Sequence, residues 1–158
     1  MLFEPNTIVI SKSGTIGRLG IIKDYMCGNR ATINIRTNKH VADHRYIFYY
    51  LLSNQAEIED MAVGSVQRNL YTSILGSIPL TLPPLEEQKA IAQTLSCLDD
   101  KIELNNRINK TLEEMAQAIF QSWFVDFEPF QDGEFEDSEL GRIPKGWRVG
   151  SLGDLLEN

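Results

Sequence analysis

The 158-residue sequence predicts an α+β fold, in which a small mixed unit over residues 1–84 precedes one long helix. Two observations predict this fold. The first half carries short β-branched segments interrupted by glycine, as strands and turns do. Residues 85–124, in contrast, contain neither proline nor glycine, which is typical of a continuous helix.

Composition favours an ordinary globular protein, because 42 % of the residues are apolar and 23 % are charged. The longest apolar run, residues 46–52, is far shorter than the roughly 20 residues that a membrane span needs. We therefore expect a cytoplasmic protein without a membrane segment. Cys27 and Cys97 form no CxxC pair, and we expect two reduced, packed thiols.

Charge is distributed unevenly along the chain, whose net charge is −7. Residues 1–84 hold eight Lys/Arg and six Asp/Glu, a net charge of +2. Residues 85–128 carry −5 and residues 129–158 carry −4. A phosphate-facing surface is therefore possible in the first part, whereas the remainder repels nucleic acid.

The first 84 residues predict a unit of α/β or α+β type. Residues 6–22 predict two strands joined by a turn at Gly14 and Gly17, and residues 31–36 predict a third strand. Asp43 is a candidate cap for a helix that a second, short helix follows over residues 55–63. The apolar residues 77–84 predict a further strand that ends in two prolines.

The long helix has a clear start signal and a periodic apolar edge. Pro84 suits a first helical turn, and Glu86 and Glu87 complement the positive end of the helix dipole. Alternating steps of four and three residues give ten positions typical of a coiled coil, which we call the seam. The seam consists of Ile91, Leu95, Leu98, Ile102, Asn105, Asn109, Leu112, Ala116, Ile119 and Trp123.

A helix of this length cannot be covered by a unit of about eighty residues, so the seam predicts a partner helix. Asn105 and Asn109 at its middle would weaken packing but penalise wrong registers. The alternative is that both asparagines lie on a solvated flank and that the contact face is formed by Leu104, Ile108 and Met115. With either face as the contact surface, we expect the helix over residues 85–128 to bind a partner.

Beyond the helix, residues 129–141 are acidic and predict a linker, and residues 142–158 resemble the start of a new fold.

Residues 76–129 resemble the spacer of the specificity (S) subunits of type I restriction-modification systems. The resemblance rests on an ordered set of motifs: PPLEEQKAIA, then LDDKI, then WFVDF. Upstream, ISKSGTIGRLGII and GSVQRNLYTSILGSIPL are similar to the second half of a target-recognition domain. Downstream, ELGRIPKGWRVGSLGDL is similar to the beginning of the next such domain.

The resemblance implies a partial target-recognition domain followed by a helix that forms an antiparallel coiled coil with a partner helix. It implies double-stranded DNA as ligand, and modification (M) and, through them, restriction (R) subunits as partners. It also implies no catalysis and no cofactor, because S-adenosylmethionine, ATP and Mg would belong to the partner subunits.

With a single spacer helix, the chain resembles a truncated or half-length subunit, and we expect a homodimer through the helix. A different function class remains open, in which the chain is a coiled-coil scaffold fragment too incomplete to bind DNA.

Two segments are candidates for DNA contact. The turn after the first strand offers Lys12, Ser13, Thr15 and Arg18 to phosphates. The loop that follows the second short helix offers Ser65, Gln67, Arg68 and Asn69, residue types that pair with adenine edges, guanine edges or phosphates. The alternative interpretation is that the two segments are a hairpin turn and a surface loop whose charged side chains are solvated.

The sequence predicts no catalytic or metal site. The glycines near residue 14 lack the Gly-Lys-Ser/Thr of a phosphate-binding loop. His40 and His44 have helical spacing but no third ligand. The aromatic residues Trp123, Phe124 and Phe127 are better explained as a packing anchor than as a base-stacking patch.

Overall fold

The computed structural model describes residues 2–64 and 68–156, and within them it has the predicted α+β composition. The chain divides into two compact units, Met1–Lys101 and Ile102–Asn158. Among the helices described, none combines the length and the apolar character that crossing a membrane requires.

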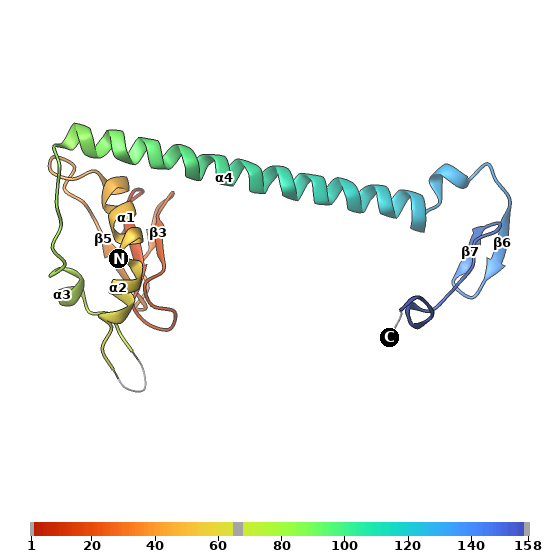
Figure 1. Cartoon of the computed structure of the whole chain (residues 1–158), viewed down its shortest axis with the longest axis horizontal. Coiled ribbons are helices and arrows are strands. Elements are labelled where there is room, and N and C mark those ends of the chain that lie inside the picture. The colour runs from red at the N-terminus through yellow and green to blue at the C-terminus, as the bar shows by residue number, and fades with distance from the viewer. Residues whose placement is uncertain (1, 65–67, 157–158) are drawn as a thin grey trace. The chain divides into compact units, whose positions relative to one another are not determined.

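A three-stranded antiparallel sheet organises the first unit (Figure 1). Its central strand is β2 (Ile8–Ser11), which lies between β3 (Leu19–Ile21) and β5 (Thr32–Ile35). The hairpin of the first two strands and the third strand are thus confirmed. A short pair that the sequence did not predict joins β1 (Leu2–Phe3) to β4 (Met26–Cys27).

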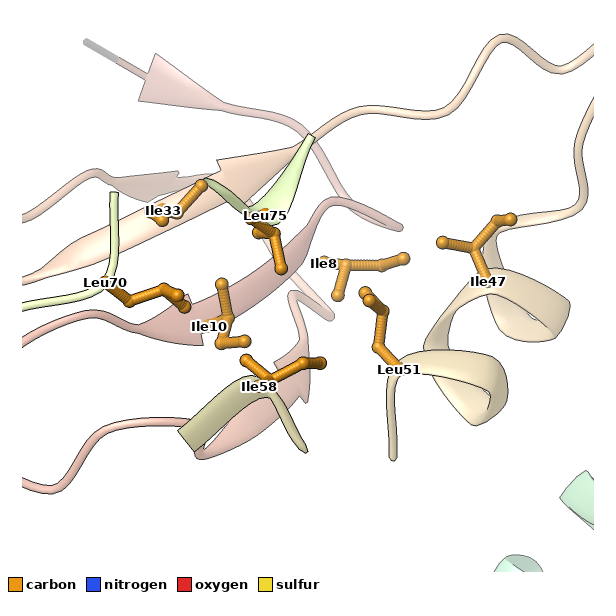
Figure 2. Packing of buried hydrophobic residues seen from close by; sticks show 8 residues of the cluster. All are labelled: Ile8, Ile10, Ile33, Ile47, Leu51, Ile58, Leu70 and Leu75. Atoms are coloured by element: carbon orange, nitrogen blue, oxygen red, sulfur yellow. The ribbon is translucent and has the colours of Figure 1, made fainter. Parts of the chain in front are cut away.

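The core of this unit lies between the sheet and two helices, α1 (His44–Ser53) and α2 (Gln55–Asp60). Figure 2 shows the isoleucines of β2 directed at side chains from both helices. This arrangement follows from period-two burial on β2, whose residues alternate between buried and half-buried. The buried cluster comprises Ile8, Ile10, Ile33, Ile47, Leu51, Ile58, Leu70 and Leu75.

Asp43 caps α1 as predicted. Its carboxylate accepts hydrogen bonds from the backbone N–H groups of Arg45 at 2.9 Å and Tyr46 at 3.1 Å. These donors have no partner inside the helix, so the cap fixes where α1 begins.

The strand predicted over residues 77–84 is wrong, because this segment pairs with no strand among the described residues. A single helical turn, α3 (Thr72–Leu75), precedes it, and the segment then runs extended past α1. Its carbonyl groups accept hydrogen bonds from tyrosine hydroxyls instead: Tyr46 donates to Thr81 at 3.1 Å and Tyr50 to Pro79 at 2.5 Å.

Helix α4 (Leu85–Phe120) is drawn in Figure 1 as one uninterrupted helix. It is shorter than the predicted 85–128, because from Gln121 to Val125 the chain continues as a π-helix. The N–H of Asp126 donates to the carbonyl of Gln121 at 2.8 Å, and Phe127 then adopts a left-handed conformation with φ of 53°. The left-handed residue ends the helical path.

In the second unit, the range predicted as a linker instead contains a 3₁₀ turn (Glu128–Phe130) and strand β6 (Phe135–Ser138). β6 pairs antiparallel with β7 (Gly141–Pro144), and a second 3₁₀ turn follows at Leu152–Leu155. Trp147 joins this hairpin to the helix end.

The rings of Phe124, Phe127 and Phe130 lie 6.0, 5.4 and 5.4 Å from the Trp147 ring between centroids. These aromatic contacts support the predicted packing anchor for Phe124 and Phe127.

Both cysteines are free thiols, as predicted, but they are exposed rather than packed.

Candidate nucleic-acid interface

The loop between β2 and β3 is held in one shape by Ser11. Its backbone exchanges hydrogen bonds with Arg18 and Gly17, each at 2.9 Å. Its hydroxyl donates to the carbonyl of Thr15 and accepts from the N–H of Arg18 at 2.9 Å. The Ser11 hydroxyl therefore satisfies one backbone carbonyl and one backbone N–H inside the turn. The polar side chains of the loop consequently project from an ordered backbone.

Gly17 is needed for this shape. Its φ of +84° is a conformation that other residues rarely adopt. A Cβ at this position would also lie 2.6 Å from Cγ of Glu59, so the loop runs close against α2.

The second candidate segment begins where α2 ends, and Arg68 anchors it. The guanidinium donates to three carbonyl groups at this helix end, those of Glu59 at 2.6 Å, Asp60 at 3.2 Å and Ala62 at 3.2 Å. Carbonyls at a helix C-terminus lack partners inside the helix and carry partial negative charge. The charge of Arg68 therefore stabilises the end of α2.

The structure brings the two candidate segments together. Ser13 forms an antiparallel bridge with Asn69, and the N–H of Leu70 donates to the carbonyl of Lys12 at 2.8 Å. Asn69 also pairs with Val63 through two hydrogen bonds of 2.9 and 3.0 Å, which closes the base of the loop. Segments more than fifty positions apart in sequence thus form one polar surface.

On this surface the side chains of Thr15, Arg18 and Arg68 are exposed, and those of Lys12, Ser13 and Asn69 are half-buried. Ser65 and Gln67, also predicted to contact DNA, lie outside the described residues.

The sequence did not single out the residue that joins this unit to α4. Gln88 is only 1 % exposed, and its side chain makes three hydrogen bonds. The amide oxygen accepts from the N–H of Asp43 at 3.0 Å, and the amide nitrogen donates to the carbonyls of Val41 at 3.2 Å and Pro83 at 2.8 Å. A polar residue next to two prolines gave little signal, because helix starts usually expose such residues.

Tyr49 makes a second connection, between α1 and α4. Its hydroxyl donates to the carboxylate of Asp99 at 2.6 Å and to the hydroxyl of Ser96 at 3.4 Å. Burial, followed by the hydrogen bond to Asp99, raises the pKa of Tyr49 above its usual value of 10.0. Together with buried Ala92, these contacts show which face of α4 the first unit covers.

The covered face is not the seam. Leu98, Ile102 and Leu112 are 61, 57 and 56 % exposed, and Ile119 and Trp123 are exposed as well. The alternative face with Leu104, Ile108 and Met115 is also exposed. Apart from Leu95, which is half-buried, the apolar side chains of both faces are therefore exposed within the part of the chain that the structure describes.

Among residues 2–64 and 68–156, no group of three or more His, Cys, Asp or Glu side chains could hold a metal ion. His44, the first residue of α1, lines a cavity of about 290 Å³ together with Arg36, Lys39 and Lys89. Burial, opposed by the neighbouring Asp43 carboxylate, lowers the pKa of His44 below 6.5, so the imidazole is neutral at pH 7.

The structure thus shows a small α+β module with two adjoining polar segments, followed by a long helix whose apolar side chains are largely exposed. Residues 1–114 match the family described as "Type I restriction modification DNA specificity domain", so the chain belongs to this family.

The chain is 35 % identical over 159 residues to the type I restriction enzyme MjaIX specificity subunit of Methanocaldococcus jannaschii, covering 99 % of this chain and 37 % of that protein. It is 39 % identical over 100 residues to the HindI specificity subunit of Haemophilus influenzae, covering 60 % of this chain and 22 % of the relative. The chain thus spans little more than a third of the length of such relatives at most.

The crystal structure of a type I restriction-modification system S subunit from M. genitalium has a similar fold. It superposes with a TM-score of 0.65 at 22 % identity, covering 86 % of this chain and 42 % of that one.

Proposed function

We propose that the chain is a DNA sequence-recognition element of a type I restriction-modification complex. It contributes position and specificity rather than chemistry, and methyl transfer and cleavage belong to modification and restriction subunits. The observation that carries the proposal is the pairing of Ser13 with Asn69, which joins the two candidate loops into one polar surface.

The residue types on this surface fit a duplex. Lys12 and Arg18 carry charges suited to phosphates, whereas Asn69 is of the type that pairs with adenine edges. The contacts of Arg68 to α2 use Nε and Nη2, and a guanidinium has five N–H donors. The same side chain can therefore hold the loop and still offer Nη1 to a phosphate or a guanine.

The distribution of charge along the chain also supports DNA contact by residues 1–84. Residues 1–84 carry +2, whereas residues 85–158 carry −9, so DNA is attracted by residues 1–84 and repelled by residues 85–158. The acidic helix then serves as a spacer, as recognition of two half-sites at a fixed separation requires.

Two copies of the chain would provide two recognition units. The uncovered seam supports a homodimer, because one sequence related by a twofold axis covers both seams at once. Analytical ultracentrifugation at micromolar concentration tests this part of the proposal, and a monomer would contradict it.

DNA binding is tested by fluorescence anisotropy on duplex DNA, with the chain purified together with its modification subunit. Arg18→Ala should weaken binding and reduce the slope of log K against log salt by about 1, the loss of one phosphate contact. Lys110→Ala, which removes the same charge from the exposed surface of α4, is the matched control and should leave both unchanged.

Equal effects of the two substitutions would show that only overall charge matters and would remove the loop from the interface. If the complex binds no DNA in a salt-dependent manner, the chain is instead a coiled-coil scaffold element.

A further inference from the structure

The middle of the seam holds two asparagines, and their positions point to a single way of pairing two copies. We propose that two α4 helices pair antiparallel with the twofold axis beside Arg107, so that Asn105 of one chain lies opposite Asn109 of the other. This inference rests on the homodimer proposed above and specifies its register.

The seam is symmetric about Arg107. Every position has a counterpart at the same distance on the other side of residue 107, and in an antiparallel pair these counterparts form layers. Within α4 the layers are Asn105 with Asn109, Ile102 with Leu112, Leu98 with Ala116, and Leu95 with Ile119, and counting on into the π-helix adds Ile91 with Trp123.

This register pairs polar with polar and apolar with apolar. Each asparagine amide has donors and an acceptor that can satisfy the amide opposite, whereas a buried amide facing an alkyl chain loses its hydrogen bonds to water without replacement. The remaining four kinds of layer are entirely apolar, and the large Trp123 lies at the end of the seam.

A slip of one heptad breaks the pairing. In one direction Asn109 faces Leu98 and Asn105 faces Ile102; in the other, Asn105 faces Ala116 and Asn109 faces Leu112. Each slipped register buries four unpaired amides per dimer and leaves two seam positions of each chain without a partner. Buried asparagines are known to fix register in this way.

The area suffices for a dimer. A helix of 36 residues is roughly 54 Å long and, with side chains, about 10–12 Å wide. One face therefore buries roughly 600 Å² per chain, or about 1,200 Å² in total, the lower end of the range for stable interfaces. The first unit buries Gln88, Ala92 and Ser96 and half-buries the seam residue Leu95, and it leaves the other nine seam positions exposed.

An in-register parallel pair would also place each asparagine opposite itself, and two features disfavour it. In a parallel pair the two helix dipoles point in the same direction and repel each other, whereas in an antiparallel pair they attract each other. A parallel pair also places both copies of Trp123 in one layer, whereas the antiparallel register matches each with Ile91.

Disulfide cross-linking tests the register, since a disulfide needs Cα atoms about 4.4–6.8 Å apart and a heptad slip moves one helix by about 10.5 Å. The exposed Cys27 and Cys97 are first replaced by serine. In this background Ile102→Cys/Leu112→Cys reports the proposed register, and Leu95→Cys/Leu112→Cys reports a slipped one. Ile102→Cys alone reports a parallel pair.

After oxidation in a glutathione buffer, the first variant should run as a covalent dimer on a non-reducing gel, and the other two should not. Replacing both asparagines by leucine should then allow the slipped reporter to cross-link as well, because nothing penalises the slip.

Cross-linking of the single variant, or of the slipped reporter with the asparagines in place, would overturn the proposed register while leaving DNA recognition untouched. A chain that sediments as a monomer would overturn both the register and the homodimer.

Discussion

Gln88 is predicted to hold the recognition unit to the long helix, and Gln88→Met tests this. Methionine has nearly the same length and volume, so the substitution removes the amide and leaves no large cavity. It deprives three backbone groups of their partner, the N–H of Asp43 and the carbonyls of Val41 and Pro83.

The magnitude follows from these contacts. A hydrogen bond of this kind contributes about 0.5–1.5 kcal/mol, and a buried group left unpaired costs about 1–3 kcal/mol. Since the thioether recovers some apolar burial, we expect a loss of about 2–4 kcal/mol in the free energy of unfolding. For a unit of this size that loss lowers Tm by roughly 10–25 °C.

Thermal unfolding followed by circular dichroism measures the effect, and Gln93→Met is the control because Gln93 lies exposed on the same helix. The control should change stability by less than about 0.5 kcal/mol. Hydrogen exchange adds a local readout, because the Asp43 amide should lose protection only in Gln88→Met. If the two variants melt together and this amide stays protected, Gln88 is not the anchor that its contacts suggest.

The remaining predictions concern other named groups and the two interfaces. His44 has a lowered pKa in the folded state, so its contribution to stability is present above pH 6.5 and lost as pH falls through the folded pKa. His44→Gln should therefore flatten the curve of Tm against pH in this range, and an unchanged curve would contradict the lowered pKa. Tyr49→Phe removes the hydroxyl that donates to Asp99 and should cost about 1 kcal/mol, less than Gln88→Met in the same melting assay, because the site is partly exposed. Arg68→Lys keeps the charge but cannot make the three carbonyl contacts, so it should increase protease cleavage near residue 64 and weaken DNA binding in anisotropy; wild-type behaviour in both assays would contradict the anchoring role. Added salt should weaken DNA binding yet tighten the helix dimer in sedimentation, because residues 85–128 of each chain carry −5; salt effects of the same sign would contradict one of the two interfaces.

Local signals in the sequence predicted much of the fold. Gly14 and Gly17 marked a hairpin that needs positive φ at both positions, and Asp43 marked the start of α1. Each of these features is decided by a few neighbouring residues, which is why residue type alone sufficed.

The errors arose where distant contacts decide the conformation. Residues 77–84 have a strand-like pattern, yet tyrosine hydroxyls of α1 satisfy their carbonyls in place of a neighbouring strand. The acidic stretch around residue 135 forms a strand that its composition did not predict. This strand is supported by Phe127, whose ring centroid lies 6.1 Å from that of Phe135, and by Arg142, whose Cζ lies 5.5 Å from the centroid of the Phe135 ring. Acidic composition gave no sign of these partners.

The candidate interface likewise combines features that the local sequence predicted with features that depend on distant contacts. The sequence supplied the residue types of both loops but not their pairing, because the bridge from Ser13 to Asn69 depends on how α2 returns the chain to the sheet. Arg68 likewise donates to carbonyls at the end of α2, and these contacts form only once the helix exists.

Stability and the proposed DNA recognition are expected to be linked in this unit. Gln88 ties the first turn of α4 to the cap of α1, and α1 packs against the sheet whose hairpin loop carries Arg18. A rigid spacer is useful for two half-sites only if each recognition unit is fixed to its helix, because rotation at the joint would change the half-site separation. We accordingly expect Gln88→Met, at temperatures where the unit remains folded, to weaken binding to a bipartite duplex more than to a single half-site, a ratio that anisotropy on the two duplexes measures. Equal weakening on both would mean that the joint affects folding alone.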